Sequence, residues 1–115
     1  TIPWQATGSK ATSLQRAFIR ELIIGQNPQG YAALCRAIAT AKASDYAAID
    51  LPFLLVAGEE DKSASMEGCR LIFGQVHSRN KRMELLENIG HWHCVEAAEE
   101  VGKSMNDFMR LVYGI

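Results

Sequence analysis

The sequence first excludes several classes of protein by what it lacks. No apolar run approaches the roughly 18 residues of a membrane-spanning helix, and the first segment lacks the basic, apolar and small-residue pattern of a signal peptide. The formal net charge over the 115 residues is only −1, which gives no reason to expect nucleic acid or an anionic membrane as a partner. With 48% hydrophobic and 22% charged residues, the composition predicts an ordinary soluble globular protein of at most one domain.

Paired cysteines are also absent. Cys35, Cys69 and Cys94 form no Cys-x-x-Cys motif, and their odd number favours reduced thiols in a cytoplasmic setting over a disulfide framework. Cys94 lies near two histidines and could be a reactive thiol, although a cysteine is more often a small buried apolar side chain. The chain begins at Thr1 rather than at methionine, so we expect a processed or truncated product.

The first part of the chain is predicted to form a pair of helices. Residues 1–11 are polar and irregular and are expected to form a loop. A helical spacing of apolar residues extends over residues 12–25. Asn27 and Pro28 then predict a new helix start, because asparagine can cap free amides and proline fits the first helical position. This second helix is expected to run to about Ala43 and to pack on the first as a helical hairpin.

The rest of the chain alternates strands with helices. Phe53–Ala57 is apolar at every position, as expected of a parallel strand covered on both faces, and Met83–Leu86 is a second short strand. Ser63 is expected to cap a helix that Gly74 ends, and a last helix spans about residues 97–112. The alternation predicts a parallel sheet with right-handed crossovers. Two strands are too few for a free-standing sheet of this type, so we expect the end of a larger domain.

Functional side chains are expected where these strands end. Asp61 and His91 follow the two strands by four and five residues, so both should project from the same edge of the sheet. A histidine there can take a proton from a nucleophile or from water, and a carboxylate can fix its tautomer and stabilise the imidazolium. The alternative is that Asp61 caps a turn and that His91 is an ordinary loop histidine. No Gly-x-Ser-x-Gly motif for a nucleophile occurs in the chain.

The chain resembles the C-terminal part of the α/β-hydrolase fold in two motifs, Pro52-x-Leu54-Leu55-Val56-x-Gly58-x-x-Asp61 and Gly90-His91-Trp92-x-x-x-Glu96-x-x-Glu99-Glu100-Val101. Within that family it is most similar to the 3-oxoadipate enol-lactonase-like proteins. The segment Asn27-Pro28-Gln29-Gly30-Tyr31 resembles the end of their helical cap. One departure is small: where relatives often have proline opening the last helix, this chain has Ala98.

The resemblance implies an α/β fold class and a division of the chain into two parts. Residues 1–45 would be the end of the cap, with its helical hairpin, and residues 46–115 would hold the last two parallel strands of the core with their flanking helices. Asp61 would be the acid and His91 the general base of a hydrolase that cleaves an ester or a lactone. The nucleophile and the oxyanion hole would belong to an N-terminal half outside these residues, so the chain alone should be inactive.

Other residues compete for roles at this site. His93 is a rival general base, but the Gly-His-Trp register favours His91. A metal site of His91, His93 and Cys94 is less favoured, because no second pair has ligand spacing, and no cofactor is expected. Glu96 could hydrogen-bond near the loop, but we expect it instead to favour the following helix terminus electrostatically. Glu60, beside the predicted acid, is expected to be a solvated turn residue.

One helical feature and two alternative functions remain open at this point. The apolar stripe of Tyr31, Leu34 and Ile38 could line a pocket under the cap, but we expect it to be core. The same fold with an aspartate nucleophile would be an epoxide hydrolase or a dehalogenase. A non-catalytic fragment would self-associate, because the apolar edge of a two-stranded sheet needs covering. The expected partners are the N-terminal half of the hydrolase or a second copy of the chain, and a small ester or lactone as substrate.

Overall fold

A computed structural model describes residues 2–115, with side chains described from residue 4 onward. The helices in chain order are α1 (Ile2–Ala6), α2 (Ser13–Ile24), α3 (Pro28–Thr40), α4 (Met66–Gln75), α5 (His93–Glu96) and α6 (Ala98–Tyr113). The strands are β1 (Phe53–Gly58), which follows a short 3-10 turn at Tyr46–Ala48, and β2 (Lys81–Leu86).

The predicted starts of α2 and α3 are confirmed. The Thr12 hydroxyl accepts a hydrogen bond from the Gln15 amide and the Gln15 side chain accepts one from the Thr12 amide, which together form a capping box. The Asn27 side chain accepts a hydrogen bond from the Gly30 amide at 2.9 Å, and Pro28 occupies the first helical position. Local side-chain chemistry therefore fixes where these helices begin.

Two predicted boundaries of α4 are wrong. Ser65 caps this helix by accepting a hydrogen bond from the Gly68 amide at 3.2 Å. Ser63 lies two residues earlier, in the turn that Asp61 caps, where its amide donates to the Asp61 carboxylate. Gly74 lies inside α4 rather than ending it. A glycine weakens a helix by only about 1 kcal/mol relative to alanine, so it is a weak stop signal by itself.

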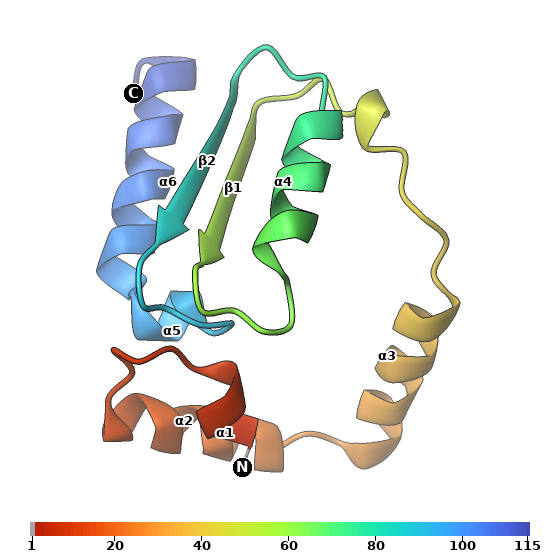
Figure 1. Cartoon of the computed structure of the whole chain (residues 1–115), viewed down its shortest axis with the longest axis vertical. Helices are drawn as coiled ribbons and strands as arrows, with labels where there is room; N and C mark the ends of the chain where they lie inside the picture. Colours follow the sequence, from red (N-terminus) through yellow and green to blue (C-terminus); the bar gives the residue numbers. More distant parts are fainter. Residues whose placement is uncertain (1) are drawn as a thin grey trace.

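The two strands form a parallel sheet, as predicted. Phe53 lies opposite Lys81, and the register continues to Gly58 opposite Leu86. In Figure 1 the two strands stand between α4 and α6, which cover them from either side. Because both strands run in the same direction, their carboxyl ends meet at one edge of the sheet, and the loops that follow them begin there.

The buried core is small for the length of the chain. Its largest fully buried side chains are Ile19 of α2 and Val76 after α4. The solvent-accessible surface is 8245 Å², whereas a compact monomer of 12.7 kDa exposes about 6,200 Å². The Cα radius of gyration is 15.8 Å, against about 13 Å for a compact domain of this length. The chain therefore exposes roughly 2,000 Å² more than a compact monomer would.

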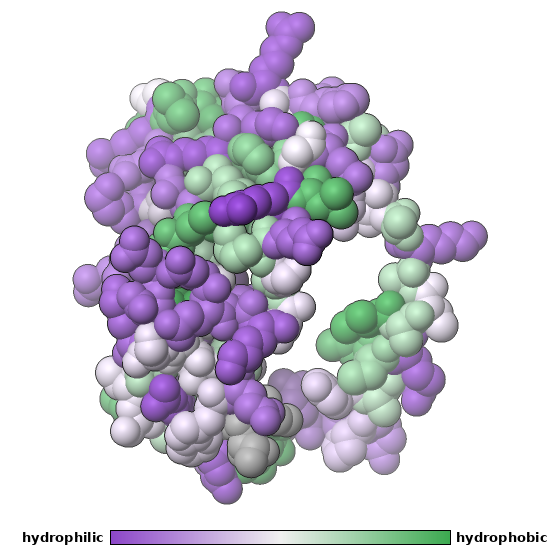
Figure 2. All heavy atoms as spheres, in the orientation of Figure 1, coloured by the Kyte–Doolittle hydropathy of each residue, from purple (hydrophilic) through white to green (hydrophobic). Residues whose placement is uncertain are grey.

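Part of the exposed apolar surface lies on α3, which stands away from the rest of the molecule (Figure 1). None of its described side chains is buried. The stripe of Tyr31, Leu34 and Ile38 is 55%, 58% and 67% exposed, so the prediction that it is core is wrong. Figure 2 shows an opening between α3 and the part that carries the sheet, with apolar side chains of α3 facing it.

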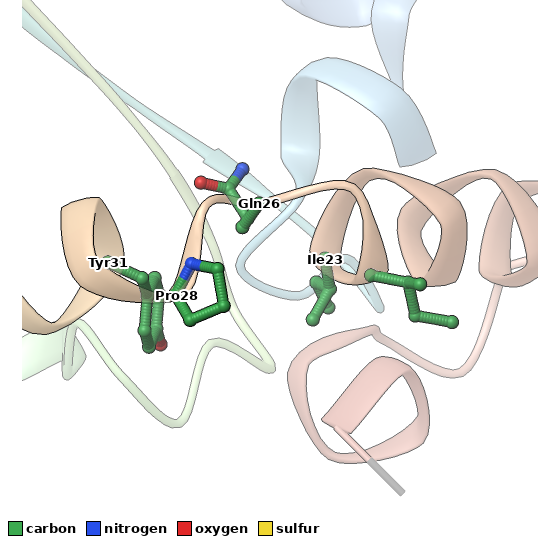
Figure 3. Close-up of a pocket in the computed structure, with 5 residues that line it drawn as sticks. Ile23, Gln26, Pro28 and Tyr31 are labelled. Atoms are coloured by element: carbon green, nitrogen blue, oxygen red, sulfur yellow. The ribbon is translucent and has the colours of Figure 1, made fainter.

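The predicted helical hairpin is also wrong. After its first residues α3 turns away from α2 instead of packing back along it (Figure 1). α2 packs instead against α1, and its apolar side chains Leu14, Phe18 and Leu22 remain 80%, 53% and 40% exposed. Where the two helices meet, Ile23, Pro28 and Tyr31 help to line a shallow pocket of about 240 Å³ (Figure 3).

Candidate active site

Two loops are held together at the carboxyl edge of the sheet. The Glu60 amide, in the turn after β1, donates to the Ile89 carbonyl in the loop after β2 at 2.8 Å. A Cβ at Gly58 would overlap the carbonyl oxygen of Gly90, so the two backbones approach as closely as only glycine permits. These are the loops that carry the predicted acid and base, and they are therefore fixed relative to each other.

The structure brings the predicted pair into contact. Nδ1 of His91 lies 2.9 Å from Oδ2 of Asp61, within hydrogen-bonding distance. The Asp61 side chain is only 5% exposed, whereas that of His91 is 48% exposed. The carboxylate is thus shielded behind the imidazole, and the imidazole reaches the surface.

The same carboxylate also caps its own turn. Oδ1 of Asp61 accepts hydrogen bonds from the Ser63 amide at 2.7 Å and from the Ala64 amide at 3.0 Å. The turn-capping alternative for Asp61 is therefore correct, but it does not exclude the contact with His91, because each function uses a different oxygen. The backbone amides orient the carboxylate and leave Oδ2 for the imidazole.

These contacts determine the protonation of the pair. Burial raises the pKa of the Asp61 carboxyl, but hydrogen bonds from the Ala64 amide, from His91 and from the Ser63 amide outweigh it and bring the pKa below its ordinary value. An ionised carboxylate can only accept hydrogen bonds, so Nδ1 of His91 carries the proton. Within the described part of the chain nothing hydrogen-bonds to Nε2, which leaves that nitrogen available as a base.

The N-terminal segment, which we expected to be an irregular loop, braces the loop of His91. After the short helix α1, the Ala6 carbonyl accepts a hydrogen bond from the His91 amide at 2.8 Å, and the Lys10 amide donates to the Asn88 carbonyl at 3.2 Å. Asn88 has a positive φ of 62°, which asparagine tolerates better than most residues. This arrangement could not be predicted from local pattern, because it joins segments about 80 positions apart in the sequence.

Glu60 also differs from its prediction. Its carboxylate accepts hydrogen bonds from the Ser9 amide at 2.7 Å and from the Ser9 hydroxyl at 2.8 Å. Glu60 is therefore not simply a solvated turn residue. It ties the turn after β1 to the N-terminal segment.

Glu96 is the site residue whose contacts the sequence did not reveal. Its side chain is buried, and Oε2 accepts hydrogen bonds from the Gly8 amide at 2.7 Å and the Gly90 amide at 3.1 Å. Oε1 accepts a third from the Trp92 amide at 3.1 Å. The expectation that Glu96 mainly favours the next helix terminus is wrong, because the carboxylate is directed into the loop of His91. Its place four residues after the Gly-His-Trp motif was the only available signal.

His93 lies in a different environment from His91. It begins α5, and it lines an apolar groove between β1 and α6 together with Leu54, Val56 and Met105. Its Nδ1 is buried and has no hydrogen-bond partner among the described residues. Among the histidines of the described residues, only His91 pairs with Asp61. This favours His91, the histidine of the Gly-His-Trp motif, over His93 as the base.

The remaining candidates are the thiol of Cys94 and a metal site. Cys94 is exposed and lines a shallow pocket of about 220 Å³ with His91, Trp92 and Val95. Among the described residues, no three histidine, cysteine, aspartate or glutamate side chains gather as metal ligands would. Over the same residues, no helix has the length and apolar character needed to cross a membrane.

Comparisons of the chain with protein-family models, with curated proteins and with solved structures found no match. The chemical meaning of the site therefore depends on its own geometry. A shielded carboxylate orients an accessible imidazole whose second nitrogen is free, and this is the arrangement that general-base catalysis requires.

Proposed function

We propose that the chain supplies the acid and the base of a serine-type α/β hydrolase that cleaves an ester or a lactone. The observation that carries the proposal is the contact of 2.9 Å between Nδ1 of His91 and Oδ2 of Asp61 at the carboxyl edge of a parallel sheet. Catalytic groups of open α/β sheets gather at that edge. In this proposal Asp61 orients the imidazole, and Nε2 of His91 performs the proton transfers.

In the proposed mechanism, Nε2 takes the hydroxyl proton of a serine as the serine oxygen attacks the acyl carbon. Asp61 stabilises the imidazolium, which then gives its proton to the departing alkoxide. In the second half of the reaction Nε2 takes a proton from water, the resulting hydroxide attacks the acyl-enzyme, and the imidazolium returns its proton to the serine. A lactone follows the same course, except that the released alcohol remains part of the product acid.

The serine is proposed to come from outside these 115 residues. The composition of the two strands supports a further polypeptide segment beside β1. That strand has no charged residue, whereas β2 carries Lys81, Arg82 and Glu84. Edge strands usually carry charges that prevent unwanted pairing, and interior parallel strands are apolar on both faces. β1 thus has the composition of an interior strand, although in the described part of the chain it pairs with β2 alone.

The exposed surface supports the same conclusion. A groove of about 420 Å³ lies beside β1, lined mostly by apolar side chains that include Leu54, Val56 and Phe108. The excess exposed area of roughly 2,000 Å² is larger than the 800 Å² or so that each partner buries in a standard interface. The proposed partner is the N-terminal half of the hydrolase, which would bring the serine; a second copy of the chain is the other occupant of this surface.

The proposal is tested with the full-length product of the gene that encodes the chain. We expect it to hydrolyse small ester and enol-lactone substrates and to react with a fluorophosphonate, which labels activated serines. Mass spectrometry of the labelled protein should find the adduct outside the 115 residues, and the 115-residue chain alone should show neither hydrolysis nor labelling. Turnover by the chain alone, or an adduct on one of its own serines, would contradict the proposal.

A further inference from the structure

We propose that Glu96 is a positioning residue, which holds the loop of His91 on the N-terminal segment and so keeps the imidazole against Asp61. The importance of Glu96 for catalysis rests on the proposed function, but its effect on the imidazole does not. Glu96 hydrogen-bonds to neither side chain of the pair; it acts on the backbone that carries His91.

The backbone on both sides of His91 is bound. The amides of the two neighbouring residues, Gly90 and Trp92, donate to opposite oxygens of the Glu96 carboxylate, each at 3.1 Å. The His91 amide between them donates to the Ala6 carbonyl at 2.8 Å. Three consecutive peptide planes are thus oriented by hydrogen bonds, which fixes the direction in which the His91 side chain leaves the loop.

Glu96 also contacts the N-terminal segment, and this contact connects the loop of His91 to that segment. Its Oε2 also accepts the Gly8 amide at 2.7 Å, so one oxygen joins the segment at Gly8 to the loop at Gly90. A Cβ at Gly90 would lie 2.5 Å from the Gly8 nitrogen, so the two backbones are in direct contact. The two backbones are close enough for one carboxylate oxygen to accept hydrogen bonds from both.

Side chains of helix α2 hydrogen-bond to both Glu96 and the N-terminal segment. The Gln15 side chain donates to the carbonyl of Glu96 itself at 3.1 Å. The Arg16 guanidinium donates to the Thr7 hydroxyl at 3.1 Å and to the Gly8 carbonyl at 3.3 Å. Helix α2 therefore holds both the backbone of Glu96 and the N-terminal segment that its carboxylate reaches.

The donor set explains why a carboxylate is needed. All three groups that point at Glu96 are N–H donors, and a carboxylate is acceptor-only at both oxygens. In the Glu96→Gln variant, one oxygen becomes an NH₂ group that faces a backbone N–H. The shape of the side chain is kept, but at least one hydrogen bond becomes a contact between two donors.

The test reads the imidazole directly by ¹⁵N NMR of the unliganded chain at about pH 9, above the ordinary histidine pKa of about 6.5. The unmodified chain should show His91 as the Nδ1–H tautomer, because Asp61 accepts that proton. Glu96→Gln should shift His91 toward the tautomer mixture of an unrestrained histidine. Glu99→Gln, at an exposed position in the first turn of α6, is the matched control and should leave the tautomer unchanged.

A folded Glu96→Gln chain in which His91 remains the Nδ1–H tautomer would overturn the proposal. Hydrogen exchange in the unmodified chain gives a second measurement that needs no variant to fold. The amide protons of Gly8, Gly90 and Trp92 should exchange as slowly as those of the β1–β2 ladder; exchange at the rate of exposed turn amides such as Lys62 would equally overturn it.

Different measurements decide the proposed hydrolase function and the proposed role of Glu96. In an active full-length protein, Glu96→Gln should reduce kcat about 10- to 100-fold with little change in KM, as expected when the base is misaligned rather than removed. If the full-length protein had no hydrolase activity, the proposed function would fail, but the tautomer and exchange measurements would still decide the role of Glu96.

Discussion

At the scale of single residues, the site depends on how Asp61 divides its two oxygens. One oxygen accepts the Ser63 and Ala64 amides, and the other meets Nδ1 of His91. The sequence predicted the positions of both members, because each follows an apolar strand by a few residues and parallel strands end at a common edge. It left the hydrogen bonding of Glu96 to its own loop as the less favoured alternative, and it could not predict the contact with Gly8, which is 88 positions away.

Asp61→Asn tests the stabilising role of the carboxylate. The amide keeps one acceptor for the turn but places an NH₂ group near one of its former donors, so we expect a loss of about 1–3 kcal/mol in the free energy of unfolding at pH 7. Because the pKa of Asp61 is lowered in the folded state, its charge contributes stability above the ordinary carboxyl pKa of about 3.9, and that contribution is lost as the pH falls through the folded pKa.

Urea titrations at pH 7 and at about pH 3 measure both effects, and the difference between Asp61→Asn and the unmodified chain should shrink at the lower pH. Asp107→Asn is the control, since Asp107 forms a surface ion pair with Lys103 at 2.6 Å and should change little. A difference for Asp61→Asn that does not depend on pH would contradict the assignment of the lowered pKa.

At the scale of elements, a glycine decides how closely the loop of His91 can approach the N-terminal segment. In Gly90→Ala the new Cβ would lie 2.7 Å from the Ala6 oxygen and 2.5 Å from the Gly8 nitrogen. We expect this variant to lose about 2 kcal/mol or more of stability, because backbone on the facing segment has to move. Gly102→Ala on α6 is the matched control, since nothing lies within 4 Å of its Cβ.

Gly102→Ala should be neutral or stabilising by about 0.4–1 kcal/mol, as at an open helical position. Thermal unfolding followed by circular dichroism compares the two variants. Equal melting temperatures for Gly90→Ala and Gly102→Ala would show that the loop of His91 is not tightly packed on the N-terminal segment.

The elements themselves were predictable to different degrees. The apolar periodicity over residues 12–25, the cap at Asn27 and the apolar run at Phe53–Ala57 located α2, α3 and β1, because these signals act through neighbouring residues. The placement of α3 was not predictable, because an apolar stripe does not specify which surface covers it. The short helix α1 lacks such local signals and is held by tertiary contacts with α2 and with the loop of His91.

At the scale of the whole molecule, the chain exposes roughly 2,000 Å² more surface than a compact monomer of its size, and large apolar side chains are part of the exposed surface. Both the uncharged strand β1 and the exposed stripe of α3 contribute to it. We expect the isolated chain to self-associate, so light scattering coupled to gel filtration should give a mass above the 12.7 kDa of one chain and rising with concentration.

Replacing Leu34 and Ile38 together with glutamate should reduce this association, whereas Arg36→Gln on the same helix should not. A single species of 12.7 kDa at all concentrations would contradict the expectation that this surface needs a partner.

The most direct test of the account compares two histidine variants of the full-length gene product in ester hydrolysis. His91→Ala should lower kcat/KM by roughly 10⁴- to 10⁶-fold, because it removes the base that Asp61 orients. His93→Ala, which removes the neighbouring histidine of the α6 groove, should keep kcat/KM within about tenfold of the unmodified enzyme. Activity that survives His91→Ala but is lost in His93→Ala would contradict the central claim that Asp61 and His91 are the catalytic pair.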